Sequence, residues 1–222
     1  GARKCTTAAA EICYSAARSA GAPENCIQWL GRATEETLQE LMAHRRLAMI
    51  LATGTNSVVQ KASKSGTPNI GVGPGNVPVY IGSTADIPFA VRCIIESKTF
   101  DYGTICASEQ AIVVKRQVSE EVIAEFKRQK AYFLTPDEIE KVGRIAYDPE
   151  RRMMRATVVG QSVQVIARSA GITVPDKTVL LIGKLDAVGP EHPLSAEILA
   201  PILGFYIEED FEAGIYRCSE IT

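Results

Sequence analysis

Among the residues whose types allow chemistry, a cysteine is the first candidate. Cys106 lies in segment 100–110, which mixes glycine, polar residues and one thiol. The segment falls between a stretch with helical periodicity and an apolar run that is typical of a strand. A thiolate is a strong nucleophile toward an electrophilic carbon, and a loop held by rigid elements suits a reactive group. Residue type alone favours a second interpretation, a buried structural cysteine, because free cysteines are commonly buried.

Few other residues offer acid, base or metal chemistry. The six cysteines are scattered, none forms a Cys-x-x-Cys pair, and the two histidines are His44 and His192. We therefore expect no metal site. A cysteine hydrolase needs a partner base, and neither histidine lies in a supporting motif. A thiol that attacks an aldehyde has an easier task, because the carbonyl is already electrophilic and hydride transfer to a cofactor avoids expelling an amine.

Three further positions invite a binding interpretation. Gly54 and Thr55 follow an apolar run and precede helical spacing, where backbone N–H groups can meet a pyrophosphate, although strand–turn–helix is also common without a ligand. Segment 71–76 predicts a tight glycine-rich turn, but Asn76 replaces the third glycine of a dinucleotide fingerprint. Glu197 precedes an apolar run, and a lone glutamate there is usually only a solvated carboxylate.

The elements that must position these residues alternate between helix and strand. Up to residue 70 the pattern predicts helix, strand, helix, strand and helix, with strands at 26–30 and 47–52 and a helix that begins after Thr34. This alternation favours a parallel sheet covered by helices. Further strands are predicted at 77–81, 111–114, 179–182 and 202–207, and further helices at 85–97, 119–130, 135 onward, 162–170 and 210 onward. We expect a domain boundary near Gly75, where the glycine cluster divides two such runs.

Composition excludes several classes of protein. The net charge is −2 and the pI is about 5.8, so no basic excess predicts binding to nucleic acid or to an acidic membrane. No apolar run approaches the roughly 18 residues of a membrane span. Scattered cysteines fit a reducing compartment, and we expect a cytoplasmic protein. Because Gly1 and Thr222 look like cut ends, we also expect the chain to be a fragment of a longer parent.

The residues around Cys106 resemble a known family. They are similar to the active-site segment of CoA-acylating aldehyde dehydrogenases, in particular the aldehyde dehydrogenase half of bifunctional aldehyde–alcohol dehydrogenases. The resemblance is carried by Ser97-Lys98-Thr99-Phe100-Asp101 and Ile105-Cys106-Ala107-Ser108-Glu109-Gln110. Segments 20–23, 50–54, 70–76, 159–162 and 197–201 also resemble that family, in its order, so the resemblance covers essentially the whole chain.

The resemblance implies a fold and a set of site residues. It implies an α/β fold in which 1–75 form the second half of a Rossmann-like NAD domain and 76–222 form most of an α/β catalytic domain, truncated at its C-terminal end. Cys106 is then the nucleophile, and its backbone N–H helps to hold the oxyanion. Gly54 and Thr55 match the turn near the cofactor pyrophosphate, and Glu197 matches the glutamate near the nicotinamide ribose.

The resemblance also implies a reaction, the NAD-dependent and reversible oxidation of a short aldehyde to acyl-CoA. Hydrolytic relatives carry a glutamate-leucine-glycine-glycine motif whose glutamate activates water, and here Gly73-Pro74-Gly75-Asn76 stands in its place. Without that carboxylate the thioacyl enzyme lacks a base for water, which favours coenzyme A as acceptor. The full-length parent is expected to form a homo-oligomer, in the cytoplasm or a bacterial microcompartment.

Two alternatives remain open at this point. One is a hydrolytic aldehyde dehydrogenase that releases a carboxylate, and the other is an inactive truncated fragment with a structural role.

Overall fold

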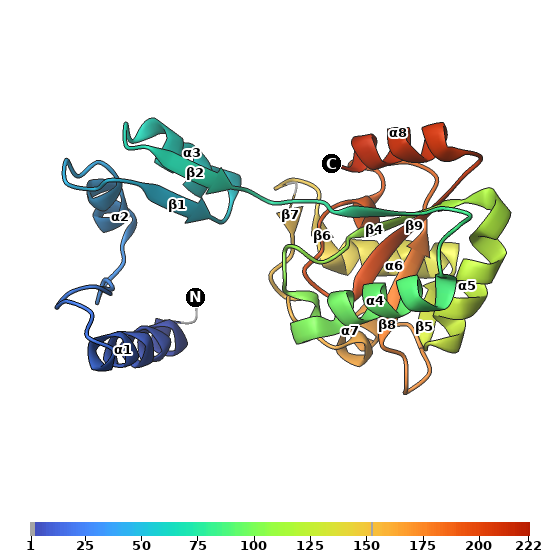
Figure 1. Ribbon diagram of the computed structural model, residues 1–222. Coiled ribbons are helices and arrows are strands. Elements are labelled where there is room, and N and C mark those ends of the chain that lie inside the picture. The colour runs from blue at the N-terminus through green and yellow to red at the C-terminus, as the bar shows by residue number, and fades with distance from the viewer. Residues whose placement is uncertain (1–2, 152) are drawn as a thin grey trace. The chain divides into compact units, whose positions relative to one another are not determined.

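The computed structural model describes residues 3–151 and 153–222. The chain divides into two compact units, Gly1–Gly73 and Pro74–Thr222, called unit 1 and unit 2 below (Figure 1). The division falls beside the expected boundary near Gly75. Within the described part of the chain, no helix is long and apolar enough to cross a membrane.

Unit 1 is built around a short parallel sheet. Its elements are α1 (Arg3–Ser19), α2 (Glu35–Met42), β1 (Ile50–Thr53), α3 (Asn56–Lys64) and β2 (Asn69–Val72). Strands β1 and β2 pair in parallel, with α3 as the crossover between them. The predicted parallel sheet is therefore confirmed here, but the predicted order of elements is not, because two helices in succession precede the two strands.

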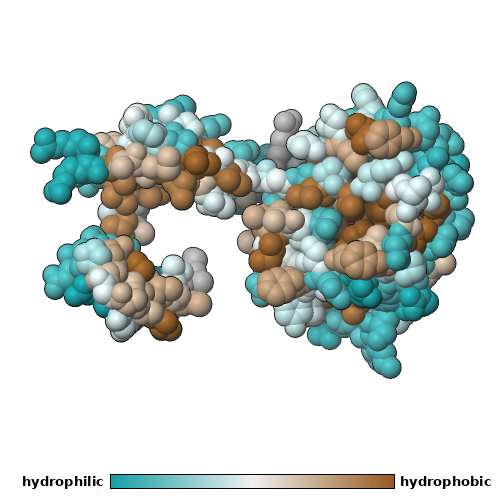
Figure 2. All heavy atoms as spheres, in the orientation of Figure 1, coloured by the Kyte–Doolittle hydropathy of each residue, from teal (hydrophilic) through white to brown (hydrophobic). Residues whose placement is uncertain are grey.

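One face of this sheet is covered and the other is open. Ile50 and Ala52 of β1 point into a small core with Ala62 of α3, whereas Leu51 between them is 75% exposed. The alternation follows from the two-residue period of a strand. Ile70 and Val72 of β2 are exposed as well. Figure 2 shows hydrophobic residues (brown) at the surface of this part of unit 1.

Two expectations for unit 1 are wrong. Residues 26–30 form turns and irregular chain instead of a strand, and Trp29 and Leu30 stay about 40% exposed. Segment 71–76 is not a tight turn: Gly71 and Val72 belong to β2, and the residues after them have no regular structure. In both cases periodicity alone could not separate a short strand from a loop.

Unit 2 contains a five-stranded parallel sheet. Its strands, in spatial order, are β3 (Pro78–Ile81), β4 (Ala111–Lys115), β9 (Ile202–Glu208), β8 (Leu180–Lys184) and β5 (Ala131–Leu134). All neighbouring pairs are parallel. The sequence predicted four of these strands and missed β5. Such strands read as continuous apolar runs because both faces of a parallel sheet are buried.

Helices cover both faces of this sheet (Figure 1). On one face lie α4 (Ile87–Thr99) and α5 (Ser119–Arg128), and on the other lie α6 (Pro136–Ala146), α7 (Val163–Ala170) and α8 (Phe211–Ile221). Strand β4 shows the division, because Ile112 and Val114 pack in the α4–α5 cluster and Ala111 and Val113 in the other. The α/β class expected from the sequence is confirmed.

Short elements complete unit 2. They are the antiparallel pair β6 (Tyr147–Asp148) and β7 (Met153–Met154), and the 3-10 turns η1 (Phe100–Gly103), η2 (Arg116–Val118) and η3 (Pro193–Ser195). Turn η1 directly follows α4 and begins the loop that carries Cys106.

Candidate active site

Two of the predicted site residues lie on segments that enter neighbouring strands at the same end of the sheet of unit 2. The Cys106 loop, residues 99–110, leads into the amino end of β4, and segment 197–201 leads into the amino end of β9. Strands β4 and β9 are parallel neighbours, with Ala111 opposite Gly204. The two approaching segments therefore lie side by side, which brings the Cys106 loop against the segment that begins with Glu197.

The Cys106 loop starts with three residues in the left-handed region. Asp101, Tyr102 and Gly103 have φ values of 47°, 54° and 75°. For the two non-glycine residues this conformation costs about 1–2 kcal/mol each. The hydroxyl of Thr104 donates to the backbone oxygen of Asp101 at 3.0 Å and to its carboxylate Oδ2 at 2.8 Å, which closes the turn. Strain held in this way is typical of functional sites.

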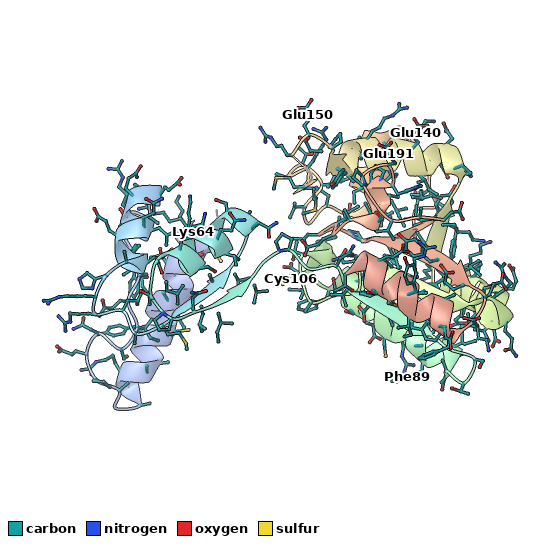
Figure 3. All side chains as sticks on the ribbon, turned by 90° about the horizontal axis from the view of Figure 1, so that it is seen from above. Lys64, Phe89, Cys106, Glu140, Glu150 and Glu191 are labelled. Atoms are coloured by element: carbon teal, nitrogen blue, oxygen red, sulfur yellow. The ribbon has the colours of Figure 1, made fainter. Side chains whose placement is uncertain are left out.

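A second turn presents the thiol. The backbone N–H and the hydroxyl of Ser108 both donate to the carbonyl of Ile105, at 3.1 and 2.7 Å. Ser108 is buried, and Cys106, in the middle of the turn, is exposed. The backbone N–H of Cys106 donates to no group that the structure describes. Figure 3 shows Cys106 on a surface loop of unit 2. The thiol and a free N–H are thus presented together on a fixed turn.

The Cys106 loop packs so closely against segment 197–201 that no side chain fits at Gly103. A Cβ at Gly103 would lie 2.6 Å from the carbonyl carbon of Ala200 and 3.0 Å from the carbonyl oxygen of Lys98. The N–H of Gly160 also binds the segment, donating to the carbonyl of Leu199 at 3.0 Å. Only glycine fits the crossing at 103, so the loop and segment 197–201 are held at a fixed distance.

A buried lysine joins the same parts. Lys98, at the end of α4, is completely buried. Its Nζ donates to Oε1 of Gln110 at 2.6 Å and to the carbonyl of Ile198 at 2.9 Å. The same Oε1 accepts the N–H of Ile198 at 3.1 Å. The residue just before the Cys106 loop and the last residue of the loop are therefore both bound to Ile198, which follows Glu197.

The charges near this lysine shift one another's titration. Burial lowers the pKa of Lys98 to about 7, against the opposing effect of the Glu197 and Glu109 carboxylates. Burial also raises the pKa of Glu197, while the N–H of Gly75 and the Lys98 ammonium act in the other direction. Each group is desolvated and partly compensated by the other. Perturbed groups of this kind cluster at functional sites.

The remaining predicted residues, Gly54 and Thr55, belong to unit 1. Thr55 is the N-cap of α3, and its side chain makes no capping hydrogen bond. The N–H groups of Asn56 and Ser57 donate to no group that the structure describes. A helix start with free N–H groups fits an anion such as a pyrophosphate. The structure thus places Cys106 and Glu197 on two segments of unit 2 that pack against each other, and places Gly54 and Thr55 in the other unit.

A well-formed cavity of unit 2 lies elsewhere. It has a volume of about 480 Å³ and is lined by residues of α6 and η3, together with Arg155 and His192. Figure 3 shows two of its lining residues, Glu140 and Glu191, together and away from Cys106. None of the predicted site residues lines it. Among the residues that the structure describes, no group of His, Cys, Asp and Glu is arranged to hold a metal ion.

Sequence reasoning missed Lys98 and Gln110 as members of the site. A signal was present, because Lys98 continues the inward stripe of α4 at helical spacing, after Val91 and Ile94. A lysine on an apolar stripe has to find buried partners. The partners themselves were not visible in the local sequence, since Ile198 lies 100 residues further along the chain.

Comparisons with known proteins agree with this geometry. The model of the aldehyde dehydrogenase family matches residues 2–143. The chain is 40% identical to aldehyde-alcohol dehydrogenase 2 of Entamoeba histolytica, over 99% of this chain and 26% of that protein. It superposes on the crystal structure of an acetylating aldehyde dehydrogenase from Geobacillus thermoglucosidasius with a TM-score of 0.93 and 47% identity, over 98% of this chain and 48% of that one.

A more distant solved relative shows chemistry on a cysteine. The propionaldehyde dehydrogenase of Rhodopseudomonas palustris, 25% identical with a TM-score of 0.83 over 94% of this chain and 47% of that one, was solved with bound CoA and an acylated cysteine. The chain thus spans about a quarter of the bifunctional relative and about half of the two solved ones. The resemblance seen around Cys106 is confirmed: the chain belongs to the aldehyde dehydrogenase family.

Proposed function

We propose that the complete protein that carries this chain oxidises a short aldehyde to acyl-CoA, with NAD⁺ as oxidant and Cys106 as the nucleophile. The observation that carries the proposal is the Cys106 turn, which presents an exposed thiol and a free N–H beside the Glu197 segment. The similarity to an acetylating aldehyde dehydrogenase over 98% of this chain supports the acylating reaction.

Each part of the turn has a task in this reaction. The Cys106 thiolate adds to the aldehyde carbon, and the free N–H of Cys106 donates to the oxygen on which negative charge develops. One such donor is typically worth about 3–4 kcal/mol of transition-state stabilisation. A bound nicotinamide dinucleotide supplies the hydride acceptor. Loss of hydride leaves a thioester on Cys106, and the thiolate of coenzyme A displaces the cysteine to give acyl-CoA.

Two features of the chain fit a dinucleotide. The start of α3 offers the free N–H groups of Asn56 and Ser57 to the pyrophosphate, next to Gly54 and Thr55. The half-buried carboxylate of Glu197 is able to accept hydrogen bonds from the hydroxyls of the nicotinamide ribose. We assign these residues to NAD⁺ by resemblance.

Coenzyme A as acceptor follows from position 73. Glycine has no side chain there, and a Cβ would lie 2.9 Å from Oδ1 of Asn56. The chain therefore supplies no carboxylate at the position where hydrolytic relatives hold their water-activating base, and the thioester awaits a thiol nucleophile. The rival function, a hydrolytic dehydrogenase, requires a base from another residue.

A coupled assay on the complete protein tests the proposal. NADH formation from acetaldehyde or propionaldehyde is expected to require coenzyme A and to be lost in Cys106→Ala. Cys26→Ala, which removes another exposed cysteine, is the matched control and should keep activity. NADH formation of equal rate without coenzyme A, together with release of carboxylate, would establish the hydrolytic rival. Full turnover in Cys106→Ala would end the assignment of the nucleophile.

A further inference from the structure

The buried ammonium of Lys98 has no task in the reaction described above. We propose that Lys98 is a positioning residue: it fixes the Cys106 loop against segment 197–201 and so holds the Glu197 carboxylate in place for the nicotinamide ribose. This inference rests on the proposed function, because it deepens the role of Glu197 in cofactor binding.

The hydrogen bonds of Lys98 support this assignment. Its Nζ is bound at 2.6 and 2.9 Å to Gln110 Oε1 and the Ile198 carbonyl, and Gln110 Oε1 also accepts the N–H of Ile198. Gln110 is itself fixed, because its N–H donates to Val77 at 2.8 Å and its carbonyl accepts from Gly204 at 3.1 Å. The backbone of Ile198 is therefore bound through both its polar groups, its N–H to Gln110 directly before β4 and its carbonyl to Lys98 at the end of α4.

The fixed Ile198 backbone affects Glu197 because the two residues are adjacent in the chain. Ile198 is the immediate neighbour of Glu197, so a fixed Ile198 backbone restricts where the Glu197 side chain begins. The Lys98 charge also acts on the Glu197 carboxylate. A purely apolar side chain at 98 would fill the space but supply neither effect. Because the exposed Cys106 turn lies between Lys98 and Gln110, the same cation sets both halves of the site.

A buried polar group of this kind is costly unless it has a use. Burying an ammonium is strongly unfavourable, and hydrophobic replacements of buried ionic groups are often neutral or stabilising. A lysine placed at 98 only for packing would be better replaced by methionine, which has a similar length. The site retains a lysine amine on an otherwise apolar helix face, beside the segment that carries the carboxylate we assign to the cofactor.

The test is a double-mutant cycle on NAD⁺ binding, measured by calorimetry on the complete protein. Lys98→Met is expected to raise the dissociation constant for NAD⁺ about tenfold, as for loss of a hydrogen bond to a charged group. In a Glu197→Gln background the same substitution should have little further effect, because Lys98 acts through Glu197. Lys177→Met, at an exposed lysine, is the control and should leave binding unchanged.

Steady-state kinetics separate positioning from general loss of structure. With Lys98→Met the KM for NAD⁺ should rise more than kcat falls, and the rate of Cys106 alkylation by iodoacetamide should change in Lys98→Met but not in Lys177→Met. A Lys98→Met substitution that weakens NAD⁺ binding equally in both backgrounds would show that Lys98 is structural only. If Lys98→Met does not fold, Lys98→Gln, which keeps a hydrogen-bond donor, takes its place in the same cycle, and equal weakening in both backgrounds again overturns the proposal.

The outcomes distinguish this inference from the proposed function. If the unchanged protein does not bind NAD⁺, the cofactor role of Glu197 is wrong and both proposals fall. If the unchanged protein binds NAD⁺ and forms acyl-CoA while Lys98→Met binds NAD⁺ equally well, only the role of Lys98 is wrong.

Discussion

Gly103 is the residue on which the geometry of the Cys106 loop depends most directly. Its φ is +75°, and a Cβ would overlap the backbone of Ala200 at 2.6 Å. Neither problem can be relieved by a side-chain rotation, because the opposing atoms belong to the backbone. The Cys106 turn follows three residues later, so a shift of the chain at 103 moves the thiol relative to segment 197–201.

The first prediction compares two glycines with similar backbone angles. Gly103→Ala should lower the free energy of unfolding by more than Gly171→Ala, whose φ is +67° but whose Cβ would meet nothing within 4 Å. Both variants carry the left-handed penalty of about 1–2 kcal/mol, and only Gly103→Ala adds a collision. Urea unfolding of the complete protein measures both. Equal losses for the two variants would mean that segment 197–201 yields easily and does not fix the loop.

The sequence revealed the nucleophile candidate but not the residues that hold it. Cys106 could be predicted from the sequence because the residues that carry the family resemblance lie next to it in the chain. Lys98 escaped notice because a lysine in the last turn of a helix normally complements the helix dipole at the surface. Its burial depends on Gln110 and Ile198, which fold against it from 12 and 100 residues away. Hydrogen-bond partners that lie so far along the chain cannot be predicted from the residues around Lys98.

At the scale of elements, the first residues of a helix were easier to predict from the sequence than the positions of short strands. A helix was expected from 135 onward, and a capping box begins it: Oε2 of Glu138 accepts the N–H of Thr135 at 2.8 Å, and Oγ1 of Thr135 accepts the N–H of Glu138 at 3.4 Å. A cap is a local signal, contained within four residues. Strand β5 was missed because it has four residues, and its identity depends on pairing with β8.

The second prediction concerns this cap. Thr135→Ala removes the acceptor for the N–H of Glu138 and should lower the free energy of unfolding by about 1 kcal/mol. Thr135→Ser retains the hydroxyl and should keep most of the stability. Activity should change little in either variant, because α6 lines the cavity away from Cys106. An unchanged stability in Thr135→Ala, measured by urea unfolding, would show that the capping box contributes nothing.

At the scale of the whole molecule, Lys98 links stability to pH. Burial lowers the pKa of its folded state to about 7, from 10.5 for the free side chain. Below 7 both the folded and the unfolded state carry the proton, and between 7 and 10.5 only the unfolded state does. The unfolded state then binds more protons, so this group makes stability rise with pH across that window. Glu197, whose folded pKa is raised by burial, acts in the opposite direction, because its folded state holds a proton above the ordinary pKa that the unfolded state has lost.

The third prediction follows from this linkage. The free energy of unfolding of the unchanged protein minus that of Lys98→Met should rise between pH 7 and 9, by up to about 1.4 kcal/mol per pH unit. Lys177→Met, which alters an exposed lysine, should show no such trend. Urea titrations at pH 7, 8 and 9 provide the data. A difference that stays constant or falls with pH would mean that Lys98 keeps its proton throughout.

The sheets of the two units differ in how many of their faces are covered. In unit 2 both faces of the parallel sheet are covered by helices, whereas in unit 1 one face of the sheet exposes Leu51, Ile70 and Val72. A parallel sheet normally has both faces covered. For this reason every functional test above is made on the complete protein.

The most direct test of the central claim is mass spectrometry of the complete protein, measured intact and after digestion to peptides. After incubation with propionaldehyde and NAD⁺ but without coenzyme A, we predict a persistent propionyl adduct on the peptide that contains Cys106, and its rapid loss as propionyl-CoA when coenzyme A is added. An adduct that forms and then disappears without coenzyme A, with free propionate as product, would contradict the account, as would an adduct on any other cysteine.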